Sequence, residues 1–532
     1  MASSNNNTSA ISRFFNGKSV FITGATGFIG KQIIEKLLRS CPGIDNIYIL
    51  IRSKRGAHVH ERVQQLCSLA LFDKVRLLTP NFKSKIIPII GDLTKANLDL
   101  TNEDEQTLIE HCHIIINSGA SIRFHEPLKQ SIKANVYSVQ NIINLCKKMK
   151  QLQSFVHIST AYIHCYRTDM TEVIYPMNDN PNTLLESLEY FDDQMFNHLS
   201  ERLAKQYPNN YAYTKSLAEY LLLKQGNNLP IAIVRPSIVG AAWKEPIPGW
   251  IDSYTGVTSI IAAIGKRLIR VAFTSPTVDL PIIPVDVVAN MTVAVAWITA
   301  TNNNLLSTPT VYNCCTGKNI KTYLTVEDFF RILATETTAI GFENYSIIGP
   351  SVTTITNKPY YCFRYYTDEV VPAYMMDIIA YLTFKKPKMV KLQEKISYLK
   401  LSLEYFAQNQ WIFANQNSQL LQSQMNDFDR QEFSFNLTEL NWPSYIRNYC
   451  IGIKKYLLKE DLQQSSIKKS SKYSFIKAKK IRHLLSILFF FAVTWLMRQT
   501  FLRRLRIIWR TLNLIIRSYL QQDKKKIICS LN

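Results

Sequence analysis

A tyrosine and a lysine lie four residues apart in the stretch NNYAYTKSLAEY, residues 209–220. On a helix, Tyr211 and Lys215 share one face, whereas Tyr213 points in nearly the opposite direction. A lysine beside a tyrosine hydroxyl favours the phenolate and lowers the tyrosine pKa from its usual value of about 10. We therefore expect Tyr211 to donate a proton near neutral pH and Tyr213 to pack against the domain.

A second hydroxyl is expected beside Tyr211, at the end of a predicted strand. The stretch VHISTAY offers Ser159 and Thr160 at this position. Alternation from Phe155 and the position at the strand end favour Thr160, with Ser159 as the alternative. This hydroxyl is expected to hydrogen-bond a substrate oxygen on which negative charge develops. The predicted catalytic residues are therefore Thr160, Tyr211 and Lys215.

Glycines at intervals of three follow the first predicted strand, in the stretch FITGATGFIG. In a nucleotide-binding turn they permit a tight turn, close approach of the backbone to a pyrophosphate, and close packing of the next helix. The alternative is a strand–helix turn without a ligand. Because a strand precedes the glycines and a helix follows them, we predict dinucleotide binding. The candidate cofactor-binding residues of this turn are Thr23, Gly24, Thr26, Gly27, Phe28, Ile29 and Gly30.

Residues at the ends of the other predicted strands indicate which cofactor the site binds. Arg52 lies 22 residues after Gly30, where an NAD site has a carboxylate for the ribose hydroxyls. An arginine there attracts a 2′-phosphate instead, which predicts NADPH; the alternative is a solvated basic loop. Further candidates at strand ends are Asp92 for the adenine, Asn117 for the nicotinamide half and Pro236 as a neighbour of the nicotinamide, with Lys215 to hold the nicotinamide ribose.

The elements that position these residues alternate between short apolar strands and helices over the first half of the chain. Short, continuously apolar strands separated by helices are typical of a parallel sheet covered on both faces. We therefore predict a doubly wound, Rossmann-type α/β fold. The predicted strands cover 19–23, 46–51, 86–90, 113–117, 154–158 and 231–235, and the predicted helices 28–40, 103–111, 126–149 and 209–225.

Beyond this region the pattern changes. Residues 243–310 form Pro- and Gly-containing loops without a clear period, and residues 355–465 are mostly helical and rich in Tyr, Phe and Leu. The second stretch predicts a smaller C-terminal helical domain. The expected organisation is a flexible N-terminus over 1–16, an NADPH-binding reductase domain over 17–350, the helical domain over 355–465, and a basic linker with a membrane-associated tail over 466–532.

The positive charge of the chain is concentrated at its C-terminus. The formal net charge is +22, and residues 462–532 contain sixteen Lys or Arg and one Asp. The other 461 residues carry 46 basic and 39 acidic groups, which argues against a nucleic-acid-binding groove. The ten cysteines are scattered, without a Cys-x-x-Cys pair, as expected for reduced thiols in the cytosol. No metal site is predicted.

The tail combines an apolar run with an amphipathic segment. Residues 484–497 are fourteen uncharged residues, short of the ~20 needed to span a bilayer. In the residues that follow, to about 520, arginines lie opposite an apolar face, which suits a helix in a membrane interface. We predict that residues 484–520 bind a lipid membrane as an interfacial or re-entrant anchor. A C-terminal span and a buried core helix are the alternatives.

The stretches TGATGFIG, HISTAY, YAYTKSLAE, VRPSIV, EPIPGWIDSYTG and IIPVDVVAN together resemble the extended short-chain dehydrogenase/reductase superfamily. Within it, the chain resembles the eukaryotic fatty acyl-CoA reductases, and WIFANQNSQLL resembles their C-terminal male-sterility domain. Residue 119 departs from the family pattern, because the family commonly has alanine where this chain has Gly119.

The resemblance implies reduction of a long-chain acyl-CoA to a primary alcohol with two NADPH, through a hemithioacetal and an aldehyde. It implies the same roles for Thr160, Tyr211 and Lys215, and a product for wax ester or ether lipid synthesis. It also implies association with the peroxisomal membrane or the endoplasmic reticulum, with the catalytic domain facing the cytosol. The alternatives are a sterol-type or other extended short-chain dehydrogenase and a catalytically silent NADPH-binding scaffold.

Overall fold

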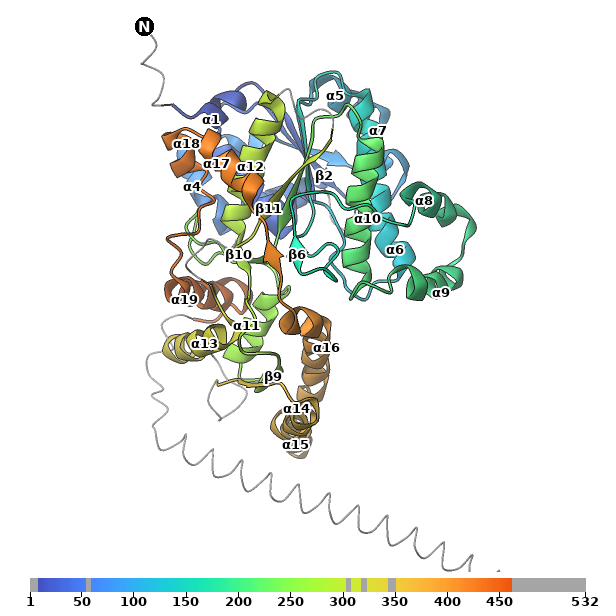
Figure 1. Ribbon diagram of the computed structural model, residues 1–532. Helices are drawn as coiled ribbons and strands as arrows, with labels where there is room; N and C mark the ends of the chain where they lie inside the picture. Colours follow the sequence, from blue (N-terminus) through green and yellow to red (C-terminus); the bar gives the residue numbers. More distant parts are fainter. Residues whose placement is uncertain (1–7, 54–58, 303–307, 317–322, 343–350, 462–532) are drawn as a thin grey trace, which may run out of the picture.

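The computed structural model describes residues 8–53, 59–302, 308–316, 323–342 and 351–461. At its centre lies a seven-stranded parallel sheet with the order β11-β7-β5-β4-β1-β2-β3 (Figure 1). The strand order reverses between β1 and β4, as in doubly wound α/β folds. The strands are β1 (Val20–Thr23), β2 (Ile47–Ile51), β3 (Ile86–Ile90), β4 (Ile114–Asn117), β5 (Ser154–Ile158), β7 (Ile231–Pro236) and β11 (Thr310–Cys314).

Helices cover both faces of the sheet, which is why its strands are apolar on both sides. Val20 and Ile22 of β1 belong to one buried cluster, whereas Phe21 between them belongs to another on the opposite face. The first face is covered mainly by α2 (Phe28–Ser40), α3 (Val59–Cys67), α4 (Asp73–Leu78) and α12 (Val285–Thr301). The second is covered by α5 (Asn102–His111), α6 (Leu128–Ile132), α7 (Ser138–Lys148), α8 (Pro181–Tyr190), α9 (Asp193–Leu203) and α10 (Asn210–Gln225).

The six predicted strands are confirmed to within about one residue at each end. Several other helices and strands were not predicted, and two of them, α12 and β11, belong to the central sheet or its covering layer. The stretch 243–310, predicted to be loops, contains the seventeen-residue helix α12. Almost all of α12 is buried, so its sequence is apolar all round and lacks the helical period on which the prediction relied. The seventh strand, β11, pairs in parallel with β7 and extends the sheet at one edge.

The N-terminal segment is helical where the structure describes it, which corrects the prediction of a flexible stretch over residues 1–16. Helix α1 (Ala10–Phe14) begins at Ser9, whose hydroxyl accepts a hydrogen bond from the backbone of Ser12. Ser9 also donates to the carboxylate of Asp429, 2.6 Å away. Ile11 and Phe15 are fully buried against the body of the protein, and their burial holds the segment in place.

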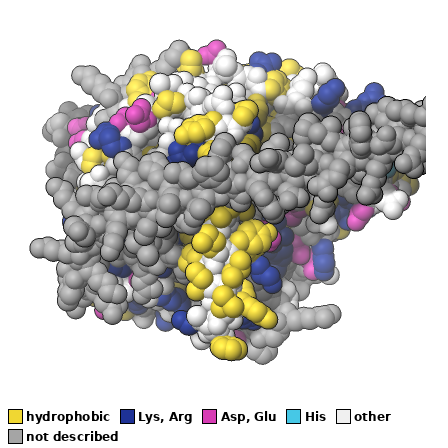
Figure 2. All heavy atoms as spheres, turned by 90° about the horizontal axis from the view of Figure 1, so that it is seen from below, with side chains coloured by type: hydrophobic (Ala, Val, Ile, Leu, Met, Phe, Trp, Pro, Cys, Tyr) yellow, Lys and Arg dark blue, Asp and Glu magenta, His cyan; other side chains and the backbone are white. Residues whose placement is uncertain are grey.

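The chain after residue 355 is helical, as predicted, and part of it returns to the reductase body. The two-residue strand β13 (Ile412–Phe413) pairs with β6 (Asp169–Met170). Beyond it, α17 (Gln416–Gln424) and α18 (Asp427–Glu432) lie near α12 at the sheet, and α19 (Trp442–Gly452) lies below them, beside α13 (Val326–Ile340) and α11 (Val257–Gly265) (Figure 1). By contrast, α14 (Lys358–Tyr365), α15 (Val371–Leu382) and α16 (Met389–Gln408) project from one end, which Figure 2 shows from below.

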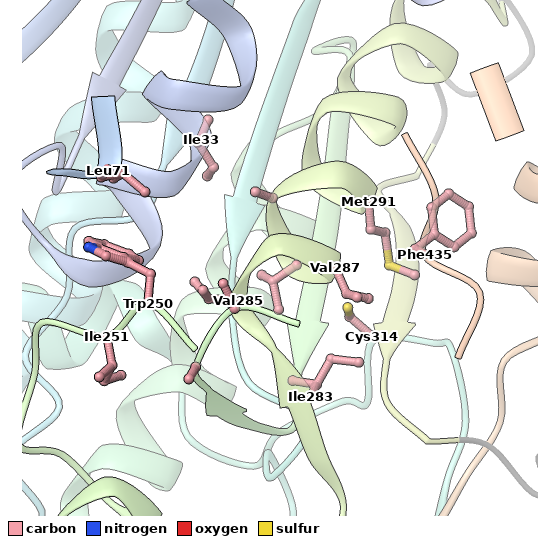
Figure 3. Close-up of a cluster of buried hydrophobic side chains, with 14 of the residues drawn as sticks. Ile33, Leu71, Trp250, Ile251, Ile283, Val285, Val287, Met291, Cys314 and Phe435 are labelled. Atoms are coloured by element: carbon pink, nitrogen blue, oxygen red, sulfur yellow. The ribbon is translucent and has the colours of Figure 1, made fainter. Parts of the chain in front are cut away.

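One buried cluster joins the two parts of the chain. Figure 3 shows Phe435 next to Met291 of α12 and near Cys314 of β11, with Val287 and Ile283 on the same side. Residues 433–453 therefore complete the core of the reductase body. The remaining strands are the short β8 (Ile238–Gly240), β9 (Val271–Phe273), β10 (Ile282–Pro284) and β12 (Thr353–Ile355).

Within the described part of the chain, we find no helix with both the length and the apolar character needed to cross a membrane. The predicted membrane segment, residues 484–520, lies outside the described residues.

Candidate active site

The carboxyl ends of the parallel strands bring the predicted site residues to one edge of the sheet. In a doubly wound fold, ligands bind at this edge, at the point where the strand order reverses. That point lies between β1 and β4, where Thr23 pairs with Asn117. Along the edge, the predicted residues follow the strand order Pro236 (β7), Thr160 (after β5), Asn117 (β4), Thr23 (β1), Arg52 (after β2) and Asp92 (after β3).

The glycine turn has the geometry of a dinucleotide cradle. Gly24 has a φ of +65°, and a Cβ atom on it would lie 2.7 Å from the backbone of Ser118 and Gly119. A Cβ atom on Gly30 would lie 2.4 Å from the carbonyl oxygen of Gly24, so helix α2 can pack this closely only with glycine there. Gly27 begins α2 without a side-chain cap, which leaves backbone N–H groups to meet a pyrophosphate. These residues fit the predicted cofactor.

The other predicted residues of this turn have clear positions. Thr26 lies in the turn itself, and Phe28 and Ile29 are partly buried in the first turn of α2. The ring of Phe28 stacks on Trp250, with 5.4 Å between the ring centres. Phe28 therefore packs the glycine turn against the loop of residues 245–253, EPIPGWIDS.

Asn117 joins three strands through its side chain. Its Oδ1 atom accepts a hydrogen bond from Thr23, and its Nδ2 atom lies 3.0 Å from Nδ1 of His157 on β5. Thr23 in turn accepts a hydrogen bond from the backbone of Gly119. Burial keeps the pKa of His157 well below its usual value, so this imidazole is neutral. Asn117 therefore holds the sheet edge together beneath the predicted nicotinamide position.

The departure from the family pattern at residue 119 has a packing explanation. A Cβ atom on Gly119 would lie 2.4 Å from Cδ1 of Leu93 and 3.1 Å from Oγ1 of Thr23. The side chain of Leu93 already fills the space that an alanine methyl group would take, so this chain has room only for glycine at residue 119.

Tyr211 and Thr160 are brought together, and Lys215 lies one turn further along α10. The hydroxyl of Thr160 lies close enough to that of Tyr211 to act on its pKa, and it accepts a hydrogen bond from the backbone of Tyr162. The hydroxyl of Ser159 has no hydrogen-bond partner among the described residues. The proximity of Thr160 to Tyr211 agrees with the choice of Thr160. The amine of Lys215 donates to the backbone carbonyl of Ile158, 2.7 Å away. The helix that carries both residues begins at Asn209, whose side chain caps the backbone of Ala212.

The prediction that Lys215 lowers the pKa of Tyr211 is wrong. Burial raises the pKa of Tyr211 to about 12, and the nearby hydroxyl of Thr160 offsets only part of this rise. Burial also lowers the pKa of Lys215 to about 8, although the carboxylate of Glu219 acts in the opposite direction. Desolvation therefore dominates both groups. At neutral pH, Tyr211 is a neutral phenol that keeps its proton to donate.

Tyr213 packs against the domain, as predicted. Its side chain is fully buried, and its hydroxyl donates to the carboxylate of Asp179 at 2.9 Å. In the part of the chain that the structure describes, no group of three or more His, Cys, Asp or Glu could hold a metal ion.

The end of β2 carries two arginines, of which sequence reasoning found one. Arg52 is exposed, and Arg62 of α3 donates to its backbone carbonyl. The guanidinium of Arg62 therefore lies at the backbone of Arg52, near the position predicted for a 2′-phosphate. Asp92, at the end of β3, accepts hydrogen bonds from the backbone and hydroxyl of Thr94 at 2.9 and 2.8 Å. One of its carboxylate oxygens is thus used to shape its own loop.

An aromatic wall stands over Tyr211. The ring of Phe124 lies 5.8 Å from Tyr211 and 5.8 Å from Phe406 at the end of α16. Phe406 also contacts Tyr162 and Trp411, at 5.1 and 6.0 Å between ring centres. The C-terminal helices therefore contribute directly to the site. Composition alone predicted an aromatic-rich domain there but could not identify Phe406.

Comparisons with known proteins agree with this geometry. Two family models, both described as "Male sterility protein", match residues 22–292 and 368–460. Fatty acyl-CoA reductase 1 of Xenopus laevis is 40% identical over 455 residues, which is 85% of this chain and 87% of that protein. Fatty acyl-CoA reductase 1 of Homo sapiens is 38% identical over 455 residues, and fatty acyl-CoA reductase 2 of Mus musculus is 38% identical over 454 residues. Each match covers 85% of this chain and 87% of the relative.

Among solved structures, the fold resembles reductase domains. The reductase domain of a nonribosomal peptide synthetase from Mycobacterium tuberculosis has a TM-score of 0.55 at 16% identity, covering 84% of this chain and 94% of that domain. The terminal R domain of the myxalamid pathway has a TM-score of 0.54 at 16% identity, covering 83% and 91%. The relatives and the two matched regions show that this chain belongs to the fatty acyl-CoA reductase family and is an oxidoreductase that binds a nicotinamide cofactor.

Proposed function

We propose that the protein reduces a long-chain fatty acyl-CoA to the primary alcohol, using NADPH, through a hemithioacetal and an aldehyde. The observation that carries the proposal is the pair Tyr211 and Thr160 at the carboxyl edge of the sheet, beside the glycine cradle and beneath the aromatic wall. The names of the relatives supply the substrate class.

The bound cofactor supplies a hydride to the carbonyl carbon of the substrate. The carbonyl oxygen then gains negative charge, and the hydroxyls of Tyr211 and Thr160 donate hydrogen bonds to it. Because the pKa of Tyr211 is raised to about 12, this hydroxyl keeps its proton at neutral pH and can pass it to an alkoxide. Lys215 is fixed by the carbonyl of Ile158, in reach of a ribose.

The preference for NADPH over NADH rests on the end of β2. The side chain of Arg62 donates to the backbone carbonyl of Arg52 there, and neither residue could accept hydrogen bonds from the ribose hydroxyls as a carboxylate does. Guanidinium groups bind phosphate through charge-assisted hydrogen bonds. This pair therefore supports recognition of the 2′-phosphate.

Membrane association is part of the proposal. The apolar run 484–497 and the basic excess after residue 462 support attachment through residues 484–520, at the peroxisomal membrane or the endoplasmic reticulum. The catalytic domain would face the cytosol, where acyl-CoA and NADPH are both present. The long-chain alcohol is then released beside the lipid in which it dissolves.

The test uses the full chain in detergent, NADPH and saturated acyl-CoAs of increasing length, with products identified by mass spectrometry. Tyr211→Phe should lower kcat by at least about 100-fold. Tyr213→Phe is the matched control, because that hydroxyl contacts Asp179, and it should keep the activity. The proposal would be rejected if NADPH were not oxidised with any of the acyl-CoAs, or if both variants lost the same share of activity. Either result would favour a sterol-type dehydrogenase or a scaffold.

A further inference from the structure

The end of the molecule formed by α15 and the turn that follows it is unusually apolar for an exposed surface. Within α15, only Ala373 is buried. Figure 2 looks at this end and shows hydrophobic side chains gathered in a band, with basic side chains at its margins. We call residues 374–388 the apolar tip. Its large exposed side chains are Tyr374, Met375, Ile378, Ile379, Tyr381, Leu382 and Phe384.

Phe384 is the most exposed of these side chains, and its backbone is strained. The residue is fully exposed, with a φ of +55°. A helix often ends in this left-handed conformation with glycine, because bulky residues adopt it at a cost. Neither packing nor chain geometry explains a phenylalanine here. A strained, fully exposed aromatic residue indicates a contact outside the folded chain.

Several backbone groups of the tip are hydrogen-bonded within it or at the start of α16. The carboxylate of Asp377 caps the start of α16, accepting from the backbone N–H groups of Lys388, Met389 and Val390 at 2.8 to 2.9 Å. The amide of Phe384 donates to Tyr381 at 3.1 Å. These hydrogen bonds lower the cost of placing the turn in the headgroup region, because each unpaired backbone group costs free energy in an apolar medium.

The charge of the tip and of the residues just after it is mainly positive. Residues 374–393 contain four lysines and one acidic residue, Asp377, whose carboxylate accepts the three backbone hydrogen bonds at the start of α16. Apolar and tyrosine side chains bordered by lysines are typical of a surface that lies in the interface of an anionic membrane. The four lysines are Lys385, Lys386, Lys388 and Lys391, and all four are exposed.

We propose that the apolar tip inserts into the headgroup region of an anionic lipid membrane, as a contact separate from residues 484–520. Charge argues against the other occupants. Residues 462–532 carry sixteen basic residues and one acidic residue, so this tail is repelled by the lysines of the tip. A second copy of the tip would bring lysines against lysines.

The contact has a consequence for the active site. Helix α16 has twenty residues and is therefore about 30 Å long. It begins beside the tip and carries, near its other end, Phe406 of the aromatic wall over Tyr211. One continuous helix thus sets the height of the site above the lipid surface.

The test places a tryptophan at the tip of the full chain. Phe384→Trp and the control Leu77→Trp are reconstituted with vesicles of phosphatidylserine and phosphatidylcholine brominated in their acyl chains. Leu77 is matched in character, since it is 84% exposed, and it lies on α4 of the reductase body. The emission of the seven native tryptophans is subtracted with the wild type. Emission added at residue 384 should shift to the blue and be quenched at least twofold, whereas emission added at residue 77 should not change.

Unquenched emission at residue 384 in these vesicles overturns the proposal, because any anchoring by the tail is the same in both variants. Emission at residue 384 that is already blue-shifted without vesicles also overturns the proposal, because it indicates that the tail or a second copy covers the tip. Dilution distinguishes these two, since it reverses the shift only if a second copy covers the tip. Adding Lys385→Gln and Lys386→Gln should lower the inserted fraction, by roughly fivefold in the insertion equilibrium per lysine. On vesicles of neutral phosphatidylcholine alone, the two lysine substitutions should leave the inserted fraction unchanged. An unchanged inserted fraction on anionic vesicles would contradict the charge argument.

Discussion

Replacing Lys215 by methionine should stabilise the protein while it removes catalytic function. The side chain is almost fully buried, and burial lowers its pKa from 10.5 to about 8. Below pH 8 the charged form is therefore destabilised in the folded state by about 3 kcal/mol. Methionine has a similar length and removes this cost. It leaves the carbonyl of Ile158 without its donor, a loss of about 1 kcal/mol. We expect a net gain of about 2 kcal/mol at pH 7.

The pH dependence gives this prediction its sign. Between pH 8 and 10.5 the unfolded wild type binds a proton that the folded wild type has released, so wild-type stability rises with pH across that window. Lys215→Met has no such group, and its advantage should disappear by about pH 10.5. Equilibrium urea unfolding at pH 7 to 10.5 measures the difference, with the exposed Lys224→Met as a control that changes little. A variant less stable than the wild type at pH 7, or a gain that persists at high pH, would refute the reasoning.

Three further substitutions test the cradle, the cofactor choice and the N-terminal contact. Gly30→Ala places a methyl group 2.4 Å from the carbonyl of Gly24, so NADPH affinity should fall at least tenfold by calorimetry; unchanged affinity would show that the turn yields easily. Arg52→Ala should raise the KM for NADPH about 10- to 100-fold and leave that for NADH unchanged, whereas an equal effect on both would remove its role in selection. Asp429→Ala removes the acceptor of Ser9 and should cost about 2–3 kcal/mol in urea unfolding; no cost would mean that α1 is held by its apolar residues alone.

What the sequence predicts well here depends on short-range pattern. Six of the seven strands of the central sheet could be located because each is a short apolar run, and Tyr211 was separated from Tyr213 by helical spacing alone. The pKa of Tyr211 could not be predicted in this way, because it is set mainly by burial of the side chain in the folded protein, which helical spacing does not show. Arg62 and Phe406 were missed for a related reason. Each reaches the site through tertiary packing, and no local motif marks it.

The two reductions in the proposed reaction make different demands on Tyr211, and this difference can be measured. After the first reduction, collapse of the hemithioacetal expels a thiolate, so the carbonyl oxygen re-forms without taking a proton. After the second, the alkoxide must take a proton to leave as alcohol. Tyr211, with its pKa raised to about 12, supplies a hydrogen bond in the first step and a proton in the second.

Thr160 remains in Tyr211→Phe and can still donate a hydrogen bond to the developing charge. The residual activity of this variant should therefore release aldehyde in preference to alcohol, and single-turnover product analysis would show it. Wild-type protein and Tyr213→Phe should both yield alcohol, since the hydroxyl of Tyr213 is bound to Asp179 away from the site. If Tyr211→Phe formed alcohol and aldehyde in the wild-type proportion, the proton in the second step would come from another group, and Tyr211 would act only through its hydrogen bond.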